Sequence, residues 1–182
     1  MIYPIVIYGN PVLRKQAAPI AADYPELNTL IDDMFKTLTK SGGVGLAAPQ
    51  IGLSIKLFIL DLSVMADDEP QYANFKKVFI NPEIIQFSSE TETSEEGCLS
   101  VPGLSERVKR SLSVTIRYFD ENWQEHTETY TGFPARAIQH EYDHLLGKIY
   151  VDHISPIRKQ LIGSKLTAMS KGKVSCHYKY KN

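Results

Sequence analysis

Two histidines and a glutamate in the second half of the chain have the spacing of a metal site. His140 and His144 lie four residues apart, and Glu141 directly follows the first of them. Side chains at positions i and i+4 of a helix share one face, with Cβ atoms about 5–6 Å apart, so both imidazoles can bind one ion. A carboxylate beside that ion can take a proton from a water molecule and pass it to a leaving group. The H-E-x-x-H spacing therefore predicts metal-dependent hydrolysis, with Glu141 as general base and acid.

The segment that carries these residues has the features of a helix. Pro134 suits a first helical turn, Ala135 and Ala137 favour helix, and Gly147 suits the end of one. We therefore expect a helix over residues 133–147, with apolar side chains that bury it against the rest of the protein.

A catalytic site of the zinc type needs three protein ligands and one open position, so the histidine pair requires a third ligand. The third position of the metzincin pattern holds Tyr150 instead of histidine, and no Asp or Glu follows His153, as a thermolysin-like site would need. His153, Cys176 and His177 are downstream alternatives. Cys98 lies in a turn-prone, glycine-flanked segment where a tight bend can bring its thiolate to the helix. We favour Cys98 over these alternatives and over a buried inert thiol.

The remaining segments predict an α+β protein, with antiparallel β-sheets packed around a central metal-binding helix that carries H-E-x-x-H, and a C-terminal helix. The length predicts a single domain over residues 1–182. Apolar residues recur every three or four positions over 23–40 and again over 156–169, where one stripe would hold Ile157, Leu161, Ile162, Leu166 and Met169. Strands are expected over 55–61, 78–87, 112–119 and 123–130, the last two as a hairpin. We expect the tail, residues 171–182, to be mobile.

Composition and charge limit the function classes. A hydrophobic content of 43%, a charged content of 23% and a net charge of −1 give no overall attraction to nucleic acid or membrane. The N-terminus lacks the basic region and cleavage site of a secretory signal, so we expect a cytoplasmic protein. Charge is nevertheless uneven, because seven Lys and Arg residues and no acidic residue lie between positions 153 and 182. Such a segment attracts polyanions, although a solvated lysine-rich helix face is the simpler interpretation.

A run of small residues over 41–52 contains four glycines and could line a substrate groove, since glycine lets another chain approach closely. It is no phosphate loop, because G-x-x-x-x-G-K-[ST] is absent. Gln50 is the one side chain in this run with both an amide donor and an acceptor. It is either a solvated loop residue or a donor to a developing oxyanion.

Three motifs together resemble those of the bacterial peptide deformylases of the iron-dependent, C-terminal-helix type. These motifs are G-V-G-L-A-A-P-Q at 43–50, E-G-C-L-S at 96–100 and Q-H-E-Y-D-H-L at 139–145, and the resemblance covers nearly the whole chain. It implies removal of the formyl group from the N-terminal formyl-methionine of newly synthesised proteins. It also implies one Fe²⁺ per chain, which Zn²⁺, Ni²⁺ or Co²⁺ can replace.

Carried over by motif position, the resemblance implies a complete site. The metal ligands fall on Cys98, His140 and His144, the general base and acid on Glu141, and the oxyanion donors on the Gln50 side chain and the Leu99 backbone N–H. The substrate would bind as an extended peptide, with its methionine in an apolar pocket, against Val44, Gly45, Gly97, Phe133, Arg136 and Ala137. Phe133 and Arg136 stand where many members have aliphatic residues; Arg136 is expected to line the pocket with its stem while its charge reaches water.

Two other functions are compatible with the H-E-x-x-H motif. The first is a metalloprotease of internal peptide bonds, which dependence of turnover on the formyl group would separate from a deformylase. The second is an inactive metal-binding module, against which Glu141 argues because binding alone needs only the ligands. The resemblance also implies docking of the basic C-terminal segment on ribosomal RNA, and no membrane partner is expected.

Overall fold

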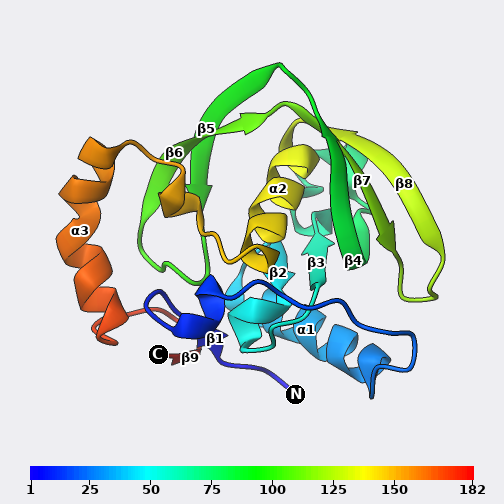
Figure 1. The fold of residues 1–182 in the computed structure, drawn as a ribbon, viewed down its shortest axis with the longest axis horizontal. Coiled ribbons are helices and arrows are strands. Elements are labelled where there is room, and N and C mark those ends of the chain that lie inside the picture. Colours follow the sequence, from blue (N-terminus) through cyan, green and yellow to red (C-terminus); the bar gives the residue numbers. More distant parts are fainter.

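One helix, α2 (Phe133–Leu145), lies at the centre of the molecule, between a large curved sheet and a β-hairpin (Figure 1). The structure is a computed structural model and describes residues 1–182. Two further helices, α1 (Leu27–Ser41) and α3 (Pro156–Ser170), lie on opposite sides of this arrangement. None of the helices has the length and apolar composition needed to cross a membrane.

The strands form three sheets. The largest is antiparallel and has the order β2-β3-β4-β7-β8, with β2 at Gly45–Ala47, β3 at Leu57–Asp61, β4 at Lys76–Phe87, β7 at Ser113–Phe119 and β8 at Glu125–Thr131. An antiparallel hairpin joins β5 (Thr91–Gly97) to β6 (Ser105–Ser111), and β1 (Ile5–Val6) pairs in parallel with β9 (Tyr180–Lys181). The predicted α+β class is confirmed, except that the pair formed by the two termini is parallel.

Strand β3 explains how the central helix is fixed against the large sheet. Successive side chains of a strand point to opposite faces. Leu57 and Ile59 accordingly pack in the core shared with α1, while Phe58 and Leu60 pack in the core shared with α2. Burial on both faces of β3 therefore holds α2 at a fixed position over the sheet.

The helix predicted from the histidine spacing is confirmed as α2. Pro134 occupies its first turn, and the chain leaves the helix through Gly147, whose φ of 73° is a conformation that glycine adopts without strain. The predicted strands overlap β3, β4, β7 and β8, and the two other predicted helices overlap α1 and α3.

Two features of the fold differ from the sequence-based expectations. The β5–β6 hairpin was not predicted, because β5 is almost entirely polar and β6 turns Glu106 and Arg110 inward beside Val108. The apolar stripe of the last helix is also narrower than predicted. Ile157 and Leu161 are 73% and 65% exposed, and the side chains that pack on the core are those of Ile162, Leu166 and Met169.

The segment after α3 ends in β9, which lies beside the N-terminal strand β1 (Figure 1). The backbone N–H groups of Ile5 and Ile7 donate hydrogen bonds to the carbonyls of Lys179 and Lys181 at 2.9 and 3.0 Å. The mobility predicted for residues 171–182 stays a prediction, and these contacts define the position that the structure gives the tail.

Candidate active site

The three sequence-predicted metal ligands lie together. The ligand atoms of Cys98, His140 and His144 are all within 4.8 Å of one another, and Cys98 Sγ lies 3.4 Å from Nε2 of His144. Metal–sulfur and metal–nitrogen bonds of about 2.3 and 2.0–2.1 Å in a tetrahedral site separate the two atoms by about 3.5 Å. The cluster therefore fits one metal ion. The rejected alternatives His153, Cys176 and His177 are not part of it.

Cys98 lies just after β5, where its sulfur faces several donors. Burial alone would raise the pKa of its thiol, but His144 and His140 outweigh that effect and lower the pKa to about 5. The N–H of Ser100 and Nε2 of Gln50 point to the sulfur at 3.4 and 3.5 Å. This environment favours the thiolate, which is the form of cysteine that binds metals.

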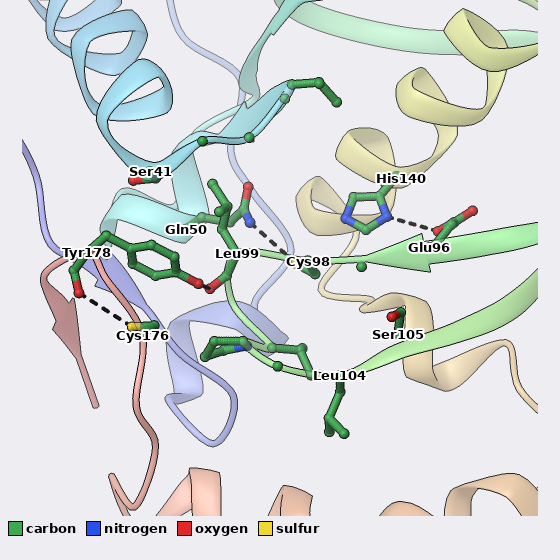
Figure 2. Close-up of a pocket in the computed structure, with 18 of the residues that line it drawn as sticks. Ser41, Gln50, Glu96, Cys98, Leu99, Leu104, Ser105, His140, Cys176 and Tyr178 are labelled. Atoms are coloured by element: carbon green, nitrogen blue, oxygen red, sulfur yellow. Dashed lines mark hydrogen bonds and ion pairs between the residues drawn. The ribbon is translucent and has the colours of Figure 1, made fainter. Parts of the chain in front are cut away.

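His140 is oriented by a buried carboxylate that sequence reasoning did not single out. Its Nδ1 lies 2.9 Å from Oε2 of Glu96, which leaves Nε2 for a metal ion (Figure 2). Arg110 donates two hydrogen bonds to the Glu96 carboxylate, and Arg136 donates a third. Burial opposes ionisation, but Arg110 and His140 hold the pKa of Glu96 well below its usual range. A partner of this kind fixes the orientation and tautomer of a metal-binding histidine.

The arrangement of Arg136 corrects one expectation. Its stem lines the groove above the cluster, but its charge does not reach water, because the guanidinium is buried against Glu96 and the carbonyl of Val108. The residue therefore neutralises Glu96. Nothing in the sequence indicates this pairing, since residues 96 and 136 meet only in the folded chain.

Glu141 lies beside the cluster and is buried. Its Oε2 has no hydrogen-bond partner in the protein, and burial raises its pKa to about 7 in spite of the opposing effect of His140 and His144. The carboxylate packs against β2 at Gly45, where an added Cβ would lie 2.5 Å from Oε1. Glycine at position 45 is therefore required for Glu141 to occupy this place.

Gln50 is a buried residue with a fixed amide, which excludes a solvated loop role. Its Oε1 accepts a hydrogen bond of 2.8 Å from the N–H of Ala47, so its Nε2 must face the cluster. Nε2 lies 3.2 Å from the hydroxyl of Ser100 as well as near Cys98. The donor end of the amide thus points to the ligand Cys98.

A groove of about 770 Å³ leads to the cluster. It is lined by all six residues predicted to bind substrate, namely Val44, Gly45, Gly97, Phe133, Arg136 and Ala137, and also by Gln50 and Leu99. The C-terminal tail contributes Ser175, Cys176, His177 and Tyr178 to the same groove, a contribution that the sequence analysis missed. The sequence does contain a pattern that could have indicated this contribution, because Val174, Cys176 and Tyr178 alternate with the polar residues Ser175 and His177. In the structure the first three are half-buried and the residues between them are exposed.

A cysteine and two histidines around one position, with an unpartnered buried carboxylate and an amide donor beside them, form the arrangement of a metal-dependent hydrolase. Comparisons with known proteins narrow this class. The family model described as Polypeptide deformylase matches residues 2–160. A peptide deformylase from Christiangramia forsetii is 49% identical over 98% of this chain and 95% of its own length, and one from Cytophaga hutchinsonii is 46% identical over 100% and 97%.

Solved structures agree with these sequence matches. A peptide deformylase from Legionella pneumophila superposes with a TM-score of 0.82 at 37% identity, over 95% of this chain and 98% of that one. Peptide deformylase 1B from Arabidopsis thaliana, solved in complex with an inhibitor, gives a TM-score of 0.83 at 34% identity, over 93% and 91%. The chain belongs to the polypeptide deformylase family.

We predict that Glu96→Gln weakens binding of Co²⁺ or Zn²⁺ by about 10–100-fold, because His140 loses the charged partner that orients it. Competition with a chromophoric chelator measures the affinity. The matched control is Glu95→Ala, which removes an exposed carboxylate from the neighbouring position of β5. Equal affinities of Glu96→Gln and the wild type would show that this carboxylate does not support the metal site.

Proposed function

We propose that this protein is a metal-dependent hydrolase that removes the formyl group from the N-terminal formyl-methionine of newly synthesised proteins. The observation that carries the proposal is the Glu141 carboxylate, which is buried with one oxygen unpartnered beside the cluster of Cys98, His140 and His144. Membership of the polypeptide deformylase family supports the formyl group as the group removed.

Cys98, His140 and His144 would hold one metal ion, which supplies Lewis acidity and makes a water molecule nucleophilic near neutral pH. We take Fe²⁺ as the native ion, replaceable by Zn²⁺, Ni²⁺ or Co²⁺. A thiolate with two imidazoles suits these ions better than Mg²⁺ or Ca²⁺, which prefer oxygen ligands.

Glu141 moves the proton in both halves of the reaction. Its carboxylate takes a proton from water as the oxygen attacks the formyl carbon, and then gives that proton to the leaving nitrogen as the C–N bond breaks. The products are formate and a free N-terminal amine. Burial supports this double role, because a carboxyl pKa raised toward 7 makes Glu141 both a better base and a usable acid.

The charge that develops on the formyl oxygen would be stabilised by two fixed donors. Nε2 of Gln50 is already aimed at the site by the hydrogen bond between Oε1 and the N–H of Ala47. The second donor is the backbone N–H of Leu99, next to the ligand Cys98. Removal of a single oxyanion donor typically costs about 100–1,000-fold in rate, so these groups are a large part of the proposed catalysis.

The peptide would enter as an extended strand between two free strand edges. β2 is the edge strand of the large sheet, and β5 pairs only with β6, so both have backbone groups available for a further strand. Val44 directly precedes β2, Gly45 begins it, and Gly97 ends β5. Main-chain pairing at these edges binds peptides of many sequences, as a general processing enzyme requires.

The methionine side chain would lie against Val44, Phe133, the stem of Arg136 and Ala137, which line the groove beside α2. Metalloproteases of internal peptide bonds share the H-E-x-x-H chemistry, and an inactive binding module would share the ligands. Family membership favours the deformylase over both, and Glu141 favours an enzyme over a module.

The decisive experiment measures formate release from a formyl-Met-peptide by anaerobically purified protein, together with its metal content. We predict that the wild type releases formate and leaves internal peptide bonds intact. Glu141→Gln should keep the metal but lose turnover by about 100-fold or more, because an amide can neither accept nor return the proton. Near-normal turnover by Glu141→Gln would disprove its role as general base, and absence of formate release by the metal-loaded wild type would disprove the proposed function.

We predict that Gly45→Ala also impairs turnover, through geometry alone. The added methyl group would lie 2.5 Å from Oε1 of Glu141 and 2.7 Å from Cδ2 of Leu60, so the carboxylate must move. A shift of about 1 Å in a catalytic group can cost about 100-fold in kcat/KM. Metal content should be unchanged, and Gly163→Ala, which places a methyl group in open space on α3, is the control. Full activity of Gly45→Ala would refute the spatial requirement.

The basic C-terminal segment supports a second part of the proposal, docking on ribosomal RNA near the emerging chain. Arg158 is already paired with Glu106, and Lys159 lies 3.5 Å from Asp152. The lysines left exposed for phosphate contacts are Lys165, Lys171, Lys173, Lys179 and Lys181. Contacts of this kind release counterions and weaken steeply with salt.

Replacement of the four tail lysines, Lys171, Lys173, Lys179 and Lys181, by glutamate should reduce co-sedimentation with ribosomes at low salt. Turnover of free formyl-peptides should persist. The same four changes at exposed lysines elsewhere, Lys15, Lys40, Lys109 and Lys148, control for net charge. Equal co-sedimentation of the two variants would show that the tail is not the anchor.

A further inference from the structure

The tail reaches the active site through a segment that we call the strap, residues 171–182. It follows α3 and lies beyond residue 160, where the family match ends. Its half-buried side chains, Val174, Cys176 and Tyr178, alternate with exposed Ser175 and His177. This period of two is that of an extended strand with one face against the protein. We call the side formed by Val174, Cys176 and Tyr178 the inner face of the strap.

The inner face of the strap touches the loop that carries the ligand Cys98. The hydroxyl of Tyr178 donates a hydrogen bond of 2.7 Å to the backbone carbonyl of Leu99, as Figure 2 shows. The N-terminal segment supports the same loop from the other side, since the N–H of Tyr8 donates to the carbonyl of Ser100 at 2.8 Å. Both ends of the chain thus hold the two residues that follow the cysteine.

The carbonyl held by Tyr178 belongs to a peptide group with a direct link to the cluster. The carbonyl of Leu99 and the N–H of Ser100 are the two ends of one planar unit. Tyr178 binds the oxygen end, while the N–H end points to Sγ of Cys98 at 3.4 Å. Because the unit is rigid, fixing its oxygen also fixes the direction of its N–H.

The same contact restrains Leu99, whose own N–H is the proposed oxyanion donor. Leu99 stands between two peptide groups, and only the one on its C-terminal side is held by a side chain of the strap. The ring of Tyr178 packs against the core that contains α1. This packing fixes the position of the hydroxyl. Tyr178 also lines the groove itself, as do residues 41–44, which precede β2.

We propose that Tyr178 is a positioning residue for hydrolysis, which holds the Leu99 peptide so that the Leu99 N–H and the Ser100 N–H face the oxyanion and the Cys98 sulfur. The strap thereby completes one wall of the substrate groove. Gly42 lines the same groove beside the strap, and an added Cβ there would be 3.8 Å from Nε2 of His177. This inference rests on the proposed formyl-peptide hydrolysis.

The test is Tyr178→Phe, which removes one hydroxyl and keeps the ring that packs on the core. An oxyanion donor acts mainly in the transition state, so kcat should fall while KM for a formyl-Met-peptide stays nearly constant. Loss of one neutral hydrogen bond corresponds to about a three- to tenfold decrease in kcat.

The matched control is Tyr180→Phe. The Tyr180 hydroxyl donates only within the strap, to the carbonyls of Gly172 and Val174 at 3.2 Å, and does not reach the cysteine loop. If the Tyr178 hydroxyl merely fastens the tail, both variants should lower Tm and leave kcat unchanged. Equal kcat values for Tyr178→Phe and Tyr180→Phe would overturn the proposal.

A second readout separates this inference from the proposed function. The thiolate-to-metal absorption band of Co²⁺-loaded protein depends on hydrogen bonds to the Cys98 sulfur, so it should shift in Tyr178→Phe and not in Tyr180→Phe. This spectrum requires no turnover. A wild type that shows no formate release would disprove the proposed function, whereas an unshifted band in Tyr178→Phe would disprove the positioning of the Ser100 N–H.

Discussion

The rest of the site depends on the ion pairs and hydrogen bonds of one buried carboxylate, that of Glu96. It lies on β5 and is neutralised by Arg110 from β6 and by Arg136 from α2, and it also holds His140. Removing one partner of a buried ion pair destabilises a protein by about 3–5 kcal/mol. Separation of the β5–β6 hairpin from α2 would therefore be strongly unfavourable. Cys98 lies two residues beyond Glu96. The same interaction therefore sets the cysteine ligand against the two histidine ligands of α2.

The polar residues of α2 have two roles, metal ligation on one face of the helix and ion pairing on another. His140 and His144 point toward Cys98 and form the ligand cluster with it, while Asp143, between them in sequence, pairs with Arg110 and His153. Arg110 thus bridges two carboxylates, those of Glu96 and Asp143. Arg110 and Arg136 together offset the charges of Glu96 and Asp143. This balance lets a helix with so many ionisable groups occupy the centre of the molecule, where an isolated charge would be prohibitive.

The sequence predicted those parts of the site that depend on local spacing. The spacing of four positions from His140 to His144 places both rings on one helix face, and the alternation over β7 and β8 predicted a hairpin. The sequence could not predict pairings between distant residues, such as Arg136 with Glu96. An arginine at position 136 of the helix could equally be buried in an ion pair or exposed to water. The amide direction of Gln50 and the space at Gly45 are likewise set by neighbours that the chain brings in only on folding.

The tail shows a different limit of sequence reasoning. Its lysines suggested a solvated, mobile end, and its apolar residues are too few to predict a strand by hydrophobicity. Yet Val174, Cys176 and Tyr178 follow a period of two, and β1 offers a backbone edge with which the end of the tail pairs. The tail is held by backbone hydrogen bonds to β1, by the Tyr178 hydroxyl, and by the side chains of Val174 and Tyr178, which pack against the core.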